Sequence, residues 1–110
     1  MSRRTGKNPG ALDDIREAIN KGSYLDSIHA YDSISTRDID RLDIRHAVNC
    51  GKRNTKHDKY SEEHQEWSYA IEGPTCDGDR NLRVIMALHH DVALLITVYE
   101  IKGDERENAV

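Results

Sequence analysis

The chain has 110 residues, which suffices for one domain with a modest core and is too short for two. Hydrophobic residues make up 36% of it, charged residues make up 33%, and Phe is absent, so a core must come from a few apolar-rich segments. The formal net charge of −4 provides no bulk electrostatic attraction to nucleic acid.

Cysteine usage and hydropathy indicate a cytoplasmic protein. Cys50 and Cys76 stand far apart and form no C-x-x-C motif, so we expect a reducing compartment instead of a disulfide framework. No run approaches the roughly 20 apolar residues of a membrane span. Arg3, Arg4 and Lys7 are followed by no apolar segment, which argues against a secretory signal.

The first helix is predicted over residues 11–21. Apolar residues recur there at steps of three and four, namely Leu12, Ile15, Ala18 and Ile19. Lys21 and Gly22 suit the end of such a helix. Residues 1–9 lack an apolar anchor, so we expect them to form a flexible tail.

Two more short helices are predicted before residue 52. One covers about 27–37, with Ile28, Tyr31 and Ile34 on one side. The other begins after Asp40, which can cap it, and Gly51 is expected to end it in the left-handed conformation.

Residues 52–66 are almost wholly polar. A strand over about 52–57 is expected at a sheet edge, where charged side chains are tolerated. The remainder is predicted to form an exposed loop that leads into Trp67.

Most large apolar side chains lie between Trp67 and Ile101, where β-branched and aromatic residues favour strands. Three antiparallel strands are predicted over 67–73, 81–89 and 93–101, with turn-forming residues between them. The last two are apolar on both faces, so both faces are expected to be largely covered.

The predicted fold class is α+β, with three short N-terminal helices packed on one face of a three- to four-stranded antiparallel sheet. Residues 10–102 are expected to form the single domain, and residues 103–110 a flexible C-terminal tail.

Several short motifs recur in a fixed order along this framework. His29-Ala30, Arg37, Ile39, Asp43-Ile44 and Ala47 match the pattern H-A-x6-R-x-I-x3-D-[VI]-x2-A. Gly51, W-x-Y-x-I-x-G, D-G, L-R-V and I-T-V-Y then follow. Over about Ile15 to Ile101 the chain resembles the DUF4258 domain family, which is similar in layout to the RelE and MqsR ribonuclease toxins.

The resemblance implies a RelE-like fold and RNA cleavage as the toxin of a toxin–antitoxin pair. An antitoxin protein and RNA or the ribosome would then be the partners. Family members usually carry Arg four residues after the histidine, where this chain has Ser33, and toxins of this layout are typically basic. Both departures favour the alternative, a non-catalytic binding or regulatory module of the same fold.

Metal-independent RNA cleavage needs a base, an acid and cations that hold the phosphate. His29 can act as base or acid near neutral pH, or it simply bonds backbone at a helix start. Arg83 lies inside an apolar strand, where it either contacts phosphate or pairs with Glu72 on the neighbouring strand.

Strand register decides whether these groups meet. Thr97 and Tyr99 share one face of the last strand. If Arg83 pairs with Tyr99, all three lie on that face with Tyr69 nearby, whereas a slip of one residue separates them. Each tyrosine either stacks a base or handles a proton, or it packs on the sheet.

Lys52, Arg53, Lys56 and Lys59 form the basic stretch of the domain. Such a stretch suits RNA backbone contacts, although a charge run is more often a solvated face. No cofactor and no metal are expected, because the histidines and cysteines lack zinc-ligand spacing. The candidate catalytic residues are His29, Arg83, Tyr99 and Thr97, and the candidate RNA-binding residues are Lys52, Arg53, Lys56 and Tyr69.

Overall fold

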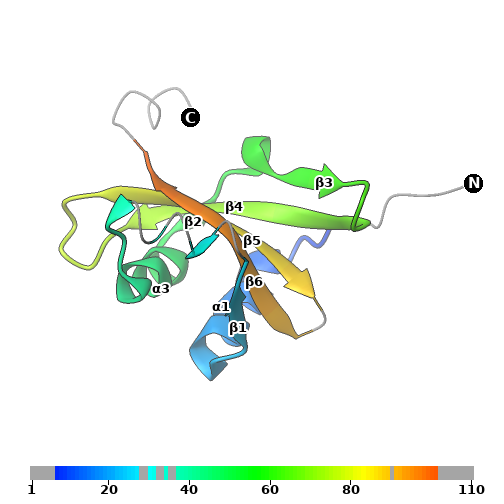
Figure 1. Ribbon diagram of the computed structural model, residues 1–110, viewed down its shortest axis with the longest axis horizontal. Helices are drawn as coiled ribbons and strands as arrows, with labels where there is room; N and C mark the ends of the chain where they lie inside the picture. The colour runs from blue at the N-terminus through cyan, green and yellow to red at the C-terminus, as the bar shows by residue number, and fades with distance from the viewer. Residues whose placement is uncertain (1–6, 28–29, 32–33, 35–36, 90, 102–110) are drawn as a thin grey trace, which may run out of the picture.

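The computed structural model describes residues 7–27, 30–31, 34, 37–89 and 91–101. In chain order these residues form helix α1 (Ala11–Lys21), strand β1 (Tyr24–Asp26), helix α3 (Arg41–Cys50), strand β2 (Lys52–Arg53), the 3-10 turn η1 (Thr55–His57) and strands β3 (Lys59–Ser61), β4 (Glu66–Pro74), β5 (Asn81–His89) and β6 (Val92–Glu100). Figure 1 shows the arrangement of these elements.

The strands form one mixed sheet of six strands in the order β1-β6-β5-β4-β2, and β3 also pairs with β4. β1 runs parallel to β6, and the other pairs are antiparallel. The prediction of three helices on a three- to four-stranded antiparallel sheet is therefore wrong, although the class remains α+β. β1 is only three residues long and β3 is polar, so neither could be recognised as a strand from the local sequence.

α1 and α3 correspond to the first and third predicted helices. Ala30, Tyr31, Ile34 and Arg37, which lie within the second predicted helix, are helical. The predicted helix over about 27–37 falls on a segment in which residues 28–29, 32–33 and 35–36 lie outside the described part of the chain. Asp40 caps α3 as predicted, because its side chain accepts a hydrogen bond from the Leu42 N–H. Gly22 ends α1 with φ of 83°, also as predicted.

The meander β4–β5–β6 agrees closely with the three predicted strands. Its register shifts once, between Ile85 and Met86, which pair with Thr97 and Leu95 and leave Ile96 as an extra residue. A bulge of this kind turns the following side chains to the other side of the strand. Leu95 and Val98 consequently both join the core.

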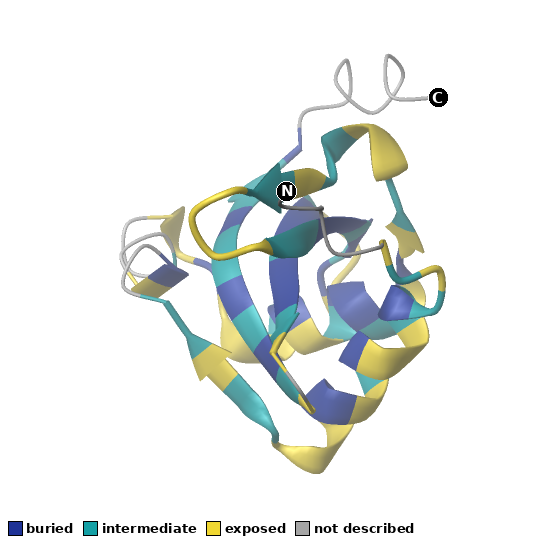
Figure 2. Ribbon diagram, turned by 90° about the vertical axis from the view of Figure 1, so that its right-hand side faces the viewer, coloured by how far each residue is buried: buried dark blue, intermediate teal, exposed yellow. Residues whose placement is uncertain are grey.

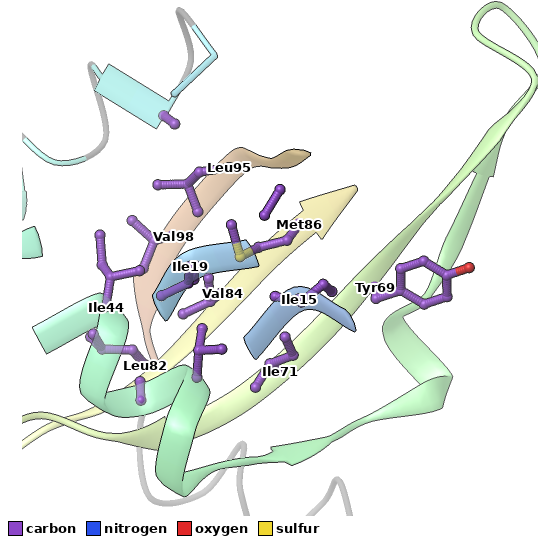
Figure 3. Packing of buried hydrophobic residues seen from close by; sticks show 14 of the residues in the cluster. Ile15, Ile19, Ile44, Tyr69, Ile71, Leu82, Val84, Met86, Leu95 and Val98 are labelled. Carbon is purple, nitrogen blue, oxygen red and sulfur yellow. The ribbon is translucent and has the colours of Figure 1, made fainter. Parts of the chain in front are cut away.

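Both helices pack on one face of the sheet, where α1 and α3 bury the apolar side of β4, β5 and β6. Figure 3 shows the cluster, in which Ile15 and Ile44 of the helices lie against Ile71, Val84 and Leu95 of the strands. The outer surfaces of the helices are largely exposed, and the buried parts of the strands lie in the middle of the sheet (Figure 2).

The opposite face of the sheet is called the open face below; it carries Glu72, Arg83, Ile85, Thr97 and Tyr99. The strand registers pair Glu72 with Arg83 and Arg83 with Tyr99. Neither α1 nor α3 covers this face, so these two helices cover the other side of the apolar strands.

Gly51 follows α3 but does not adopt the predicted left-handed conformation, since its φ is −90°. A Cβ added there would lie 2.3 Å from the Ala47 carbonyl oxygen and 2.4 Å from the Glu72 carbonyl oxygen. The prediction of a left-handed stop is thus wrong. Gly51 is required because the end of α3 touches the backbone of β4.

Candidate functional site

Arg83 forms the centre of a polar cluster on the open face. Its Nε donates to Glu72 Oε2 at 2.7 Å, and its Nη1 donates to the Tyr99 hydroxyl at 3.0 Å. Arg83 is only 5% exposed. Burial opposes its charge, but the hydrogen bonds to Tyr99 and Glu72 outweigh burial and raise the pKa of Arg83 above its ordinary value. The guanidinium is therefore charged and held between two strands.

This geometry confirms the salt bridge predicted for Arg83, while the phosphate contact stays a prediction. The salt bridge to Glu72 is present, and the register that pairs Arg83 with Tyr99 is present as well. Thr97 pairs with Ile85 and lies two residues before Tyr99 in β6, on the same face. The open face thus gathers three of the four residues predicted to be catalytic. The fourth, His29, lies outside the described residues.

Glu72 links the Arg83 cluster to the connection after β2. Its Oε2 atom also accepts a hydrogen bond of 2.8 Å from Asn54 Nδ2. Asn54 is itself fixed, because its Oδ1 accepts from the Lys56 N–H at 3.2 Å. Glu72 Oε1 accepts no hydrogen bond from any residue that the structure describes. One carboxylate oxygen is thereby anchored twice, and the other stays available.

A groove of about 490 Å³ lies beside this carboxylate. Its lining includes Lys52, Asn54, Lys56, Glu72 and Asn81, and the end of α3 contributes to the wall. Lys52 and Lys56 are exposed, and within the described part of the chain neither ammonium group has an ion pair. The groove therefore presents two available cations and one available carboxylate oxygen.

Arg53 also borders the groove, but its guanidinium is engaged elsewhere. Its Nη2 lies 2.6 Å from Asp58 Oδ2, and its guanidinium carbon lies 4.9 Å from the centre of the Tyr69 ring. The Asp58 side chain is fully buried and also accepts from the Ala70 N–H at 3.0 Å. Arg53 thus serves a structural ion pair in this conformation.

Tyr69 lies on the helix side of the sheet, which corrects the expectation that it stands near Arg83. It pairs with Met86 and belongs to the buried cluster of Figure 3, where its hydroxyl points away from the other labelled side chains. That hydroxyl accepts a hydrogen bond of 3.0 Å from the Asn8 N–H. Lys7 lies 3.0 Å from Asp58, so residues assigned to a tail by the sequence analysis contact the domain.

Sequence analysis missed Asn54 and gave Glu72 only the role of a salt-bridge partner. Both matter because β2 pairs with β4 and places Lys52 opposite Glu72, twenty residues later in the chain. A pairing of two residues leaves no periodic signal in the sequence. The only local hint is that a polar side chain at Glu72 interrupts the apolar stretch Tyr69–Gly73.

The described residues provide little support for a metal site or for a nucleophilic thiol. No group of three His, Cys, Asp or Glu side chains there is arranged to hold a metal ion. Desolvation and a hydrogen bond with Asp43 raise the pKa of Cys76, which keeps this thiol protonated and weakly nucleophilic at neutral pH. None of the described helices is long and apolar enough to cross a membrane.

A family model described as a domain of unknown function, DUF4258, matches residues 26–100. The chain belongs to this family. The match runs from the end of β1 to the end of β6, so this DUF4258 segment contains the groove and the Arg83 cluster but not α1. No curated protein and no solved structure shows significant similarity to the chain.

Proposed function

We propose that this DUF4258 domain binds single-stranded RNA, with the groove beside β2 holding the phosphate backbone. The observation that carries the proposal is the pair of exposed ammonium groups, Lys52 and Lys56, on a groove of about 490 Å³ at the edge of the open face. Cationic grooves next to exposed aromatic side chains are the usual means of holding single strands.

The charge distribution favours contact with a short segment of RNA. The chain as a whole is acidic, with a net charge of −4, so long-range attraction to RNA is absent. Lys52 and Lys56 concentrate positive charge locally, and each can neutralise one phosphate. Two such contacts suit a segment of a few nucleotides.

Tyr99 would stack a base beside this groove, on a ring over which the Arg83 guanidinium carbon lies 5.4 Å from the ring centre. It is half-buried on the open face, and its hydroxyl is hydrogen-bonded to Arg83. Arg83 also contacts Glu72, so one arginine side chain spans the distance from the groove to Tyr99. A base stacked on an aromatic ring contributes about 1–3 kcal/mol to binding.

The second candidate is an endoribonuclease of the RelE type, the toxin of a toxin–antitoxin pair. The presence of Arg83, Tyr99 and Thr97 on one face favours it. Arg83 would have to leave Glu72 to reach a phosphate, which is why binding without cleavage is proposed first. In an active toxin His29 would serve as acid or base, the target would be RNA or the ribosome, and an antitoxin would cover the groove.

Fluorescence anisotropy with labelled single-stranded RNA tests the proposal. The double variant K52A/K56A should weaken binding by about tenfold or more, because it removes both phosphate contacts. The matched control is K21A/R45A, which removes the same charge from the outer surfaces of α1 and α3. Equal weakening by both double variants would show that RNA binding depends only on net charge, and would exclude the groove as the binding site.

Growth after induced expression separates binding from cleavage. Growth arrest with fragmented RNA in the wild type, lost in H29A, would establish the endoribonuclease. Normal growth with intact RNA and soluble protein would favour the non-catalytic binding module.

A further inference from the structure

Glu72 is an unusual group to find in a groove that binds an anion. It lines the groove together with Lys52 and Lys56. A phosphate beside this carboxylate would be repelled. The part of the ligand next to Glu72 must therefore be a hydrogen-bond donor, while the anionic part lies with the lysines.

The carboxylate is also held in one orientation. Arg83 and Asn54 both donate to Oε2, at 2.7 Å and 2.8 Å. Rotation of the carboxylate would break both bonds, so Oε1 is a fixed acceptor. Fixed acceptors of this kind discriminate between ligands better than mobile ones, because the binding geometry is set before the ligand arrives.

We propose that Glu72 reads the base of the bound nucleotide by accepting a hydrogen bond from an exocyclic amino group. This inference rests on the proposed RNA binding. Cytosine, adenine and guanine carry such a group, and carboxylates commonly accept from the N4 amine of cytosine. Uracil carries the O4 acceptor at the matching position and would be repelled. The groove therefore prefers amino-bearing bases to uracil.

A purely structural role is the competing explanation, in which Glu72 only neutralises Arg83. The variant E72Q separates the two. The glutamine oxygen takes the place of Oε2, because Arg83 and Asn54 both present donors there. The glutamine NH2 then occupies the position of Oε1 and offers a donor to the ligand. A base reader would reverse its preference, whereas a charge-balancing residue would leave the preference unchanged.

The experiment measures anisotropy of labelled oligo(C) and oligo(U) of about ten nucleotides with the full chain. We expect the wild type to bind oligo(C) about tenfold tighter, and E72Q to bind oligo(U) more tightly than oligo(C). Equal wild-type affinity for both oligomers would overturn the inference and leave RNA binding intact. Absence of binding to either oligomer would overturn both proposals.

A second variant guards against failure of E72Q to fold. N54A keeps the Arg83–Glu72 ion pair but removes one of the two donors that orient the carboxylate. The preference for oligo(C) should fall to about threefold or less while the protein stays folded by circular dichroism. A tenfold preference that persists in folded N54A, and in E72Q if it folds, would contradict the assignment.

Discussion

Gly51 and Gly73 lie in such close contact that a Cβ added to Gly73 would fall 2.9 Å from the Cα of Gly51. The same Cβ would lie 2.3 Å from the Ala47 carbonyl oxygen. The end of α3 therefore rests directly on the backbone of β4. This contact sets the start of β2, which pairs with β4 and brings Lys52 opposite Glu72. Two glycines thus define one end of the groove.

G73A should destabilise the domain by about 1–3 kcal/mol, because the backbone of α3 or β4 must move to admit the methyl group. Urea denaturation measures the change. G10A is the control: its Cβ would lie 3.6 Å from Asn8 Oδ1, an ordinary contact, and its φ of −95° suits alanine. Equal stability of G73A and wild type would show that the contact is not tight.

D58N should cost about 3–5 kcal/mol of folding free energy. The Asp58 side chain is fully buried and pairs with Arg53 and Lys7, so neutralising it leaves the Arg53 guanidinium without its counter-charge. E17Q removes an exposed pair with Lys21 and should change stability by no more than about 0.5 kcal/mol. Thermal unfolding of the two variants beside the wild type checks the contrast.

RNA affinity should fall with salt according to the number of phosphates held by lysine. With two contacts, the logarithm of the association constant should fall against the logarithm of salt concentration with a slope of about −1.4. K52A should reduce the slope by about 0.7, because one phosphate contact is lost. A slope that is the same in K52A and wild type would show that Lys52 does not contact a phosphate of the bound RNA.

Alkylation of Cys76 should require a higher pH than alkylation of an ordinary thiol. Desolvation and Asp43 raise the pKa of Cys76, so less thiolate is present at any given pH. The rate of reaction with iodoacetamide is measured in C50S, so that Cys76 is the reacting thiol. This rate should rise at higher pH than the rate for free cysteine. D43N removes the negative charge and keeps an amide oxygen that can accept from the Cys76 N–H, so its rate profile should move to lower pH. An unchanged profile in D43N would show that the Asp43 charge does not contribute to the raised pKa of Cys76.

The β4–β5–β6 meander could be predicted because local signals define it. Apolar β-branched residues fill the strands, and turn residues such as Gly78, with φ of 78°, separate β4 from β5. The two caps at Asp40 and Gly22 were predictable for the same reason, since each depends on neighbours in the chain.

Long-range pairing accounts for most of what could not be predicted. β1 has three residues and gains its stability from β6, almost seventy residues away. Glycine at position 51 suggested a helix stop, whereas the residue that requires it lies in β4. The Arg83–Tyr99 pair was predictable only as one of two registers, because alternation alone cannot choose between them.

Chemical-shift mapping by ¹H–¹⁵N NMR during titration with oligo(C) tests the central claim most directly. Binding in the groove should move the backbone signals of Lys52, Asn54, Lys56 and Glu72, and leave those of Glu17 and Lys21 on the outer surface of α1 in place. Shifts that cluster on α1, or no shifts at RNA concentrations that saturate the anisotropy signal, would contradict the assignment of the groove as the RNA-binding site.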